Sequence, residues 1–198
     1  MRKFNCLDDI PTAEQFRHVL NRMRYRKLFA ATFCSTAAAV TVAAAAAVLL
    51  SWLLLPVIYV TGTSMEPLLS NGQIVLCNKL IAPERGDVIA MYYNKKVLLK
   101  RVIAVAGDVV EMDGSGHVLL NGEILPEPYV REFAAGECDI EFPYTVKENR
   151  WFVMGDNRAV SIDSRASAFG CAADENILGV VRFRIYPFDL PHWLGESK

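Results

Sequence analysis

The longest feature of the hydrophobic pattern is an uncharged stretch near the N-terminus. Residues 28–60 contain no Asp, Glu, Lys or Arg. A helix of about 20 apolar residues crosses the roughly 30 Å hydrocarbon core of a bilayer, and residues 28–50 supply that length. A cleaved signal peptide has a shorter apolar region of about 7–15 residues. The pattern therefore predicts a transmembrane helix over residues 28–52, rather than a signal peptide or a buried core helix.

The residues before this stretch are polar and end in a basic cluster, made up of Arg17, Arg22, Arg24, Arg26 and Lys27. Basic side chains that flank a membrane span favour the cytoplasmic side. We therefore expect residues 1–27 to be cytoplasmic, with a single-pass anchor in the cell membrane. The chain from residue 57 to residue 198 would then be extracytoplasmic.

After Pro56, which ends the helical pattern, the chain contains short β-branched and aromatic segments separated by turn residues. Strands are predicted at residues 57–60, 73–78, 88–93, 97–105, 150–154 and 180–186. Asn71-Gly72, Asp113-Gly114 and Asn121-Gly122 are typical turns. Residues 126–144 contain three prolines and no regular pattern, which predicts a flap within a smaller inserted region at about 108–150. One short helical turn is expected at 173–177. Many short strands predict a mainly β domain with a folded or closed sheet.

The charge and the cysteine spacing bear on which kinds of binding site the chain can have. The net charge of the 198 residues is −1, so the chain has no overall basic character of the kind that favours nucleic-acid binding. The cysteines form no CxxC pair and have no metal-ligand spacing, so we expect neither a metal nor a cofactor. Of the three cysteines after the apolar stretch, Cys77, Cys138 and Cys171, two can form a disulfide or all three can be free thiols.

Ser64 is the candidate nucleophile, because it lies in a loop of small and turn-forming residues just beyond the predicted membrane exit. A serine hydroxyl needs a base to become nucleophilic. Histidine is the usual base, but His117 lies in a turn and His192 lies six residues from the C-terminus, so both are typical of surface positions. Lys100 interrupts an apolar strand instead, and burial can lower the pKa of a lysine enough for it to accept a proton. The neighbouring Arg101 cannot act as a base, since guanidinium keeps its proton.

A third polar segment, at residues 155–165, combines Asp156, Arg158, Asp163 and Arg165 with Ser161. These charges are either a surface loop held by its own ion pairs or a rigid network that orients a neighbouring site.

Taken in order, these segments resemble the bacterial type I signal peptidases, which are serine proteases with a Ser-Lys dyad. The matching motifs are Ser64-Met-Glu-Pro67, Arg85-Gly-Asp-Val88, Lys100-Arg-Val-Ile103 with Gly107-Asp108, Gly155-Asp-Asn-Arg158, Ser161-x-Asp-Ser-Arg165 and the closing segment 169–188. The resemblance implies a signal-peptidase-like β domain outside the membrane. It further implies that Ser64 is the nucleophile, that Lys100 is the general base, and that Ser161 orients the lysine with support from Asp163 and Arg165.

The resemblance also places the oxyanion hole at Gly62, Thr63 and Ser64. The Ser64 backbone N–H would be one donor. Some family members use a hydroxyl two residues before the serine, where this chain has Gly62, so the second donor here would be Thr61, Thr63 or a backbone N–H. Ala104 and Ala106 also stand where glycine and proline are common in the family, and we expect only small local changes from them.

The implied function is a membrane-anchored endopeptidase that cleaves signal peptides from preproteins with small residues before the cleavage site. Met65 is a candidate lining residue for the shallow pockets this requires, or else an ordinary core residue. Two alternatives fit the same features: a self-processing Ser-Lys protease, and a non-enzymatic, membrane-tethered β domain that binds a partner.

Overall fold

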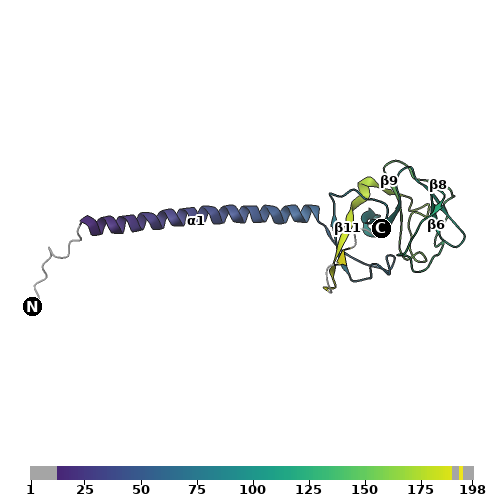
Figure 1. Ribbon diagram of the computed structural model, residues 1–198, viewed down its shortest axis with the longest axis horizontal. Helices are drawn as coiled ribbons and strands as arrows, with labels where there is room; N and C mark the ends of the chain where they lie inside the picture. The colour runs from purple at the N-terminus through teal and green to yellow at the C-terminus, as the bar shows by residue number, and fades with distance from the viewer. Residues whose placement is uncertain (1–12, 189–191, 194–198) are drawn as a thin grey trace, which may run out of the picture. The chain divides into compact units, whose positions relative to one another are not determined.

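The computed structural model describes residues 13–188 and 192–193. By its contacts the chain divides between Ser51 and Trp52 into two compact units, a helical one and a β-rich one (Figure 1). Each unit is described by itself below.

The described part of the first unit belongs to helix α1, which runs from Ala13 to Leu54 over 42 residues and so ends three residues inside the second unit. By length and composition it is the one described helix able to cross a membrane. It begins earlier than the predicted span because the preceding polar residues are mostly good helix formers without Gly or Pro. The hydroxyls of Thr32, Thr36 and Thr41 each donate to a carbonyl of their own helix three or four residues earlier, at 2.8–3.0 Å, so these three hydroxyls are paired within the helix.

The second unit contains two antiparallel sheets. The larger has the strand order β1-β2-β11-β3-β4-β9-β10, with β12 paired to β11. Its strands are β1 (Val57–Tyr59), β2 (Ile74–Asn78), β3 (Val88–Tyr93), β4 (Lys96–Ala104), β9 (Arg150–Met154), β10 (Ala172–Ala173), β11 (Ile177–Tyr186) and β12 (His192–Trp193). The smaller sheet has the order β7-β6-β5-β8. Its strands are β5 (Val109–Met112), β6 (Val118–Leu120), β7 (Glu123–Ile124) and β8 (Tyr144–Thr145). In Figure 1, β6 and β8 lie together, away from β11.

The predicted fold class, mainly β after one N-terminal helix, is confirmed. Every predicted strand occurs within a few residues of its expected position, and the predicted helical turn is the 3₁₀ helix at Asp174–Asn176. The β3–β4 and β6–β7 hairpins turn through residues with positive φ, Asn94 and Lys95 in one and Asn121 and Gly122 in the other. Such two-residue turns match the twist of the strands they join.

Strand β4 carries two buried cationic side chains, Lys100 and Arg101. It pairs with β3 and β9, so that Lys100 lies opposite Ile89, and Arg101 lies opposite Val88 and Met154. Residues 99–104 of β4 are all buried. The alternation along the strand directs Lys100 and Arg101 to opposite faces, and both faces are covered.

Candidate active site

The loop that carries Ser64 is held on both sides of that residue. The Leu69 N–H donates to the Met65 carbonyl at 2.9 Å, and both of these side chains are buried in the core. On the other side, the Gly62 N–H donates to the Asn71 side chain at 3.1 Å. Gly62 has a φ of +91°, a conformation that favours glycine. The half-buried Ser64 therefore lies on a short turn whose position is set by the core.

A second segment, 91–93 residues further along the chain, contacts the carbonyl of Ser64. The backbone N–H of Asn157 donates to the Ser64 carbonyl oxygen at 3.0 Å, and its side chain donates to the Thr63 carbonyl at 3.2 Å. Gly155 is packed between the same oxygen and Ser161. A Cβ at this position would lie 2.5 Å from the Ser64 oxygen and 2.3 Å from the Ser161 hydroxyl oxygen. Only glycine allows this close approach of the two segments.

Lys100, on β4, reaches the contact between the Ser64 loop and residues 155–161, which we call the junction. Its Nζ donates to the Ser161 Oγ at 2.6 Å, and only 3% of the residue is exposed. Burial lowers the pKa of Lys100 from 10.5 to about 8. The carboxylate of Asp163 opposes this shift, and the charge of Arg165 contributes to it. A lysine with this pKa has a substantial neutral fraction near physiological pH.

Asp163 and Arg165 form a buried ion pair beneath the lysine. The Arg165 Nε donates to Asp163 Oδ1 at 2.8 Å, and the Gly155 N–H donates to Asp163 Oδ2 at 2.9 Å. Burial alone would raise the pKa of Asp163, but the hydrogen bonds and charge of Arg165 outweigh it, so the pKa is lowered. Arg165 also donates to the carbonyls of Ala134 and Ala135, which ties the predicted flap to this network.

Arg101 belongs to a separate ion pair. It donates to both carboxylate oxygens of Asp156, at 2.8 and 2.7 Å, and its guanidinium lies 3.9 Å from the centre of the Tyr129 ring. Arg165, not Arg101, supplies the cationic contribution to the lowered pKa of Lys100. This agrees with the opposite directions of neighbouring side chains on a strand.

A small cavity of about 30 Å³ adjoins Ser64. Its lining includes Ile58, Tyr59, Gly62, Ser64, Met65 and Leu98. Met65 lines this cavity and is only 2% exposed in the core, and its contact with a substrate side chain stays a prediction.

The remaining sequence candidates lie elsewhere. His117 is in the β5–β6 hairpin, where its ring contacts Phe133 at 4.0 Å between centroids. His192 lies in β12, and its side chain is outside the described part of the structure. Within that part, Cys34, Cys77, Cys138 and Cys171 are free thiols, and no group of three or more His, Cys, Asp or Glu side chains comes together in a way that could hold a metal.

The sequence motifs include Gly155 and Asn157 but do not predict their contacts with the Ser64 loop, and the sequence does not predict a role for Glu127. Glu127 lies in the flap and forms a fully buried ion pair with Arg158. Its sequence signal is slight: a single acidic residue between two prolines.

Comparison with known proteins gives consistent matches. The family model described as "Signal peptidase, peptidase S26" matches residues 33–186. Signal peptidase I S of Bacillus subtilis is 32% identical over 165 residues, which cover 77% of this chain and 89% of that protein. A signal peptidase I of Bacillus amyloliquefaciens is 32% identical over 180 residues, 84% of this chain and 91% of that one.

Two further matches come from other genera. Signal peptidase IB of Staphylococcus aureus is 34% identical over 149 residues, 65% of this chain and 76% of that one. The crystal structure of a signal peptidase I from Enterococcus faecalis has 30% sequence identity and a TM-score of 0.42, and the match covers 50% of this chain and 97% of that one.

Proposed function

Since this chain belongs to the signal peptidase family, peptidase S26, we propose that Ser64 and Lys100 are the catalytic pair with which it cleaves signal peptides. Membership makes the chain a hydrolase and sets aside the non-enzymatic alternative. The observation that carries the residue assignment is the buried hydrogen bond from Lys100 to Ser161. Ser161 is separated from the Ser64 carbonyl only by the closely packed Gly155.

In the proposed reaction, the Ser64 Oγ attacks the carbonyl carbon of the residue before the cut while its proton passes to the Lys100 Nζ. The resulting ammonium gives that proton to the leaving amine as the carbon–nitrogen bond breaks. The acyl group then remains on Ser64. Lys100, neutral again, accepts a proton from water as that water attacks the acyl carbon. The bond between this carbon and the Ser64 Oγ then breaks, the lysine ammonium returns the proton to the Ser64 Oγ, and the signal peptide leaves with a new carboxyl terminus. One lysine serves both half-reactions because it alternates between its two protonation states.

The surrounding residues would position this lysine. Ser161 accepts the hydrogen bond from Lys100 and adds no charge. Asp163 and Arg165 hold the loop of Ser161 and act on the pKa of the lysine in opposite directions. A rigid support of this kind keeps a general base within reach of the proton it transfers.

For the oxyanion, we assign the first donor to the backbone N–H of Ser64. Within the described residues nothing accepts a hydrogen bond from it, whereas the Gly62 N–H is already bonded to Asn71. Gly62 therefore shapes the loop rather than donating. Thr61, Thr63 or a backbone N–H are the candidates for the second donor, in place of the hydroxyl that some relatives carry at position 62.

The substrates are preproteins with small residues before the cleavage site. The cavity beside Ser64 supports this assignment, since a volume of about 30 Å³ matches a small apolar side chain better than a large one. Incubation of the purified chain with a precursor bearing Ala-x-Ala before the mature start tests the proposal. We expect cleavage after the second Ala, and none by Ser64→Ala or Lys100→Ala. Cleavage confined to the enzyme's own chain would favour the self-processing alternative.

We further propose that residues 28–52 cross the cell membrane, that residues 1–27 are cytoplasmic, and that residues 57–198 form the extracytoplasmic catalytic domain, with the inserted region at about 108–150. The basic residues of α1 support this orientation. Protease added outside intact cells should digest the β domain and spare residues 1–27. Cleavage within residues 1–27 would reverse the orientation.

A further inference from the structure

The flap contains a buried carboxylate that has no part in the reaction as proposed. Glu127 accepts hydrogen bonds from both terminal nitrogens of Arg158, one of them at 3.0 Å, and from the Tyr129 hydroxyl at 2.9 Å. The side chains of Glu127 and Arg158 are both fully buried. Burial, followed by the charge of Glu127, raises the pKa of Tyr129, so this hydroxyl stays a hydrogen-bond donor. All three groups are thus paired.

Arg158 connects this carboxylate to the catalytic junction. Its Nε donates to the Gly155 carbonyl at 3.2 Å, and its own carbonyl accepts a hydrogen bond from Arg165 at 3.0 Å. Gly155 is the residue packed between the Ser64 carbonyl and the Ser161 hydroxyl, with no room for a Cβ. A displacement of Gly155 therefore changes the distance between the loop of Ser64 and the partner of Lys100.

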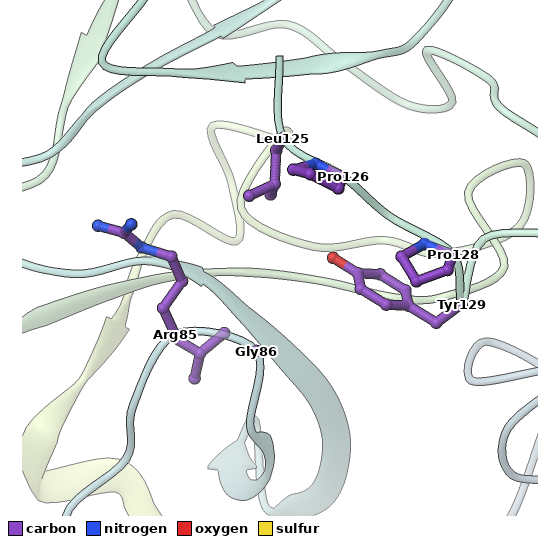
Figure 2. Close-up of a pocket in the computed structure, with 7 residues that line it drawn as sticks. Arg85, Gly86, Leu125, Pro126, Pro128 and Tyr129 are labelled. Atoms are coloured by element: carbon purple, nitrogen blue, oxygen red, sulfur yellow. The ribbon is translucent and has the colours of Figure 1, made fainter. Parts of the chain in front are cut away.

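Apolar packing holds residues 125–129 only in part. A cavity of about 210 Å³ separates them from the turn at Arg85 and Gly86. Figure 2 shows Pro126, Pro128 and Tyr129 on one side of this cavity, with Arg85 and Gly86 on the other. Since a cavity forfeits close contacts on one side, the polar contacts of Glu127 and the stacking of Tyr129 on Arg101 carry more of the attachment.

We propose that Glu127 is a positioning residue of the active site, which acts through Arg158 and Gly155 to set the spacing between Ser64 and the Lys100–Ser161 pair. This inference rests on the proposed function, because it presumes that Ser64 and Lys100 react. A group held this way affects the rate of the bound substrate's reaction more than substrate binding, since misplacement by about 1 Å can cost roughly 100-fold in rate.

The test uses the full chain in detergent and a soluble peptide with Ala-x-Ala before the cut. Active sites are titrated with a serine-reactive acylating inhibitor, so that kcat refers to folded enzyme only. Glu127→Gln keeps the shape of the side chain and removes its charge. The double variant Glu127→Leu with Arg158→Met replaces the ion pair by apolar groups, which often preserves stability. Asp87→Asn, which breaks the half-buried ion pair with Arg182, is the control for lost stability alone.

We expect Glu127→Gln to lower kcat per titrated site by about 10- to 100-fold, with KM changed less than about threefold. The apolar double variant should recover thermal stability but keep the low kcat, and Asp87→Asn should keep the native kcat. Native kcat in the apolar double variant would overturn the proposal, and that variant decides the question if Glu127→Gln gives no titratable enzyme. Activity in Ser64→Ala would instead overturn the proposed function itself.

Discussion

The pKa of Lys100 makes a quantitative prediction about the pH dependence of catalysis. With a pKa of about 8, this lysine is neutral in about one molecule in ten at pH 7, whereas an unperturbed lysine is neutral in about one in 2,500. The buried position thus increases the reactive fraction about 250-fold, which corresponds to about 3 kcal/mol. Burial is the largest cause of the lowered pKa. Of the nearby charges, Asp163 and Asp156 raise the pKa of the lysine and Arg165 lowers it.

We expect kcat/KM to rise about tenfold per pH unit below pH 8, to reach half its maximum near pH 8, and to level off above it. The assay is cleavage of a peptide that has no group titrating between pH 5 and 10, with circular dichroism to confirm folding across that range. Lys100→Arg should be inactive at every pH, because guanidinium keeps its proton.

Two results would refute this reasoning. A flat profile between pH 6 and 10 would mean that no group with a pKa near 8 controls the reaction. A near-native rate in Lys100→Arg would remove lysine as the base. His117→Ala is the control, since His117 lies in the β5–β6 hairpin turn and contacts Phe133, and its profile should match that of the wild type.

Three further predictions concern the same residues. The folded-state pKa of Lys100, about 8, lies below its ordinary value of 10.5, so the unfolded chain binds more protons between these values and stability rises with pH across that window. Lys100→Met should therefore stabilise the protein by about 1–3 kcal/mol at pH 7 and lose this slope, as measured by denaturant unfolding at pH 7 and 10; a destabilised variant would contradict it. Ser161→Ala should keep the pH limb but lower the plateau about 10- to 100-fold, and an unchanged plateau in the rate assay would exclude its orienting role. Ser64→Ala with Lys100→Ala should be no slower than either single variant, because residues that act as a unit are not additive; a further loss in cleavage rate would show that they act separately.

The position of Lys100 could be predicted because a strand has a period of two. Apolar residues on both sides of Lys100 and Arg101 required that at least one cation be buried, and the structure buries both. The partners could not be predicted in the same way. Asp156 lies 55 residues from Arg101 and Glu127 lies 31 residues from Arg158, and no local period relates positions this far apart.

The limits of the hydrophobic pattern are also visible in the helix and in the smallest strands. Apolar residues mark the part of α1 that can cross a membrane, whereas the helix itself continues back to Ala13 through polar residues with good helix propensity. The two-residue strands β7, β8, β10 and β12 are too short to show alternation. They exist because neighbouring strands offer backbone groups to pair with, which is a property of the fold.

The central claim is that Lys100 activates Ser64. Its most direct test is to detect an acyl group attached to Ser64. The full chain is incubated at pH 8 with a serine-reactive acylating inhibitor, and the modified residue is located by mass spectrometry. We predict one adduct per chain, on Ser64, formed at least 100-fold more slowly in Lys100→Ala and absent in Ser64→Ala. An adduct on another residue, or labelling of Ser64 at an equal rate without Lys100, would contradict the account.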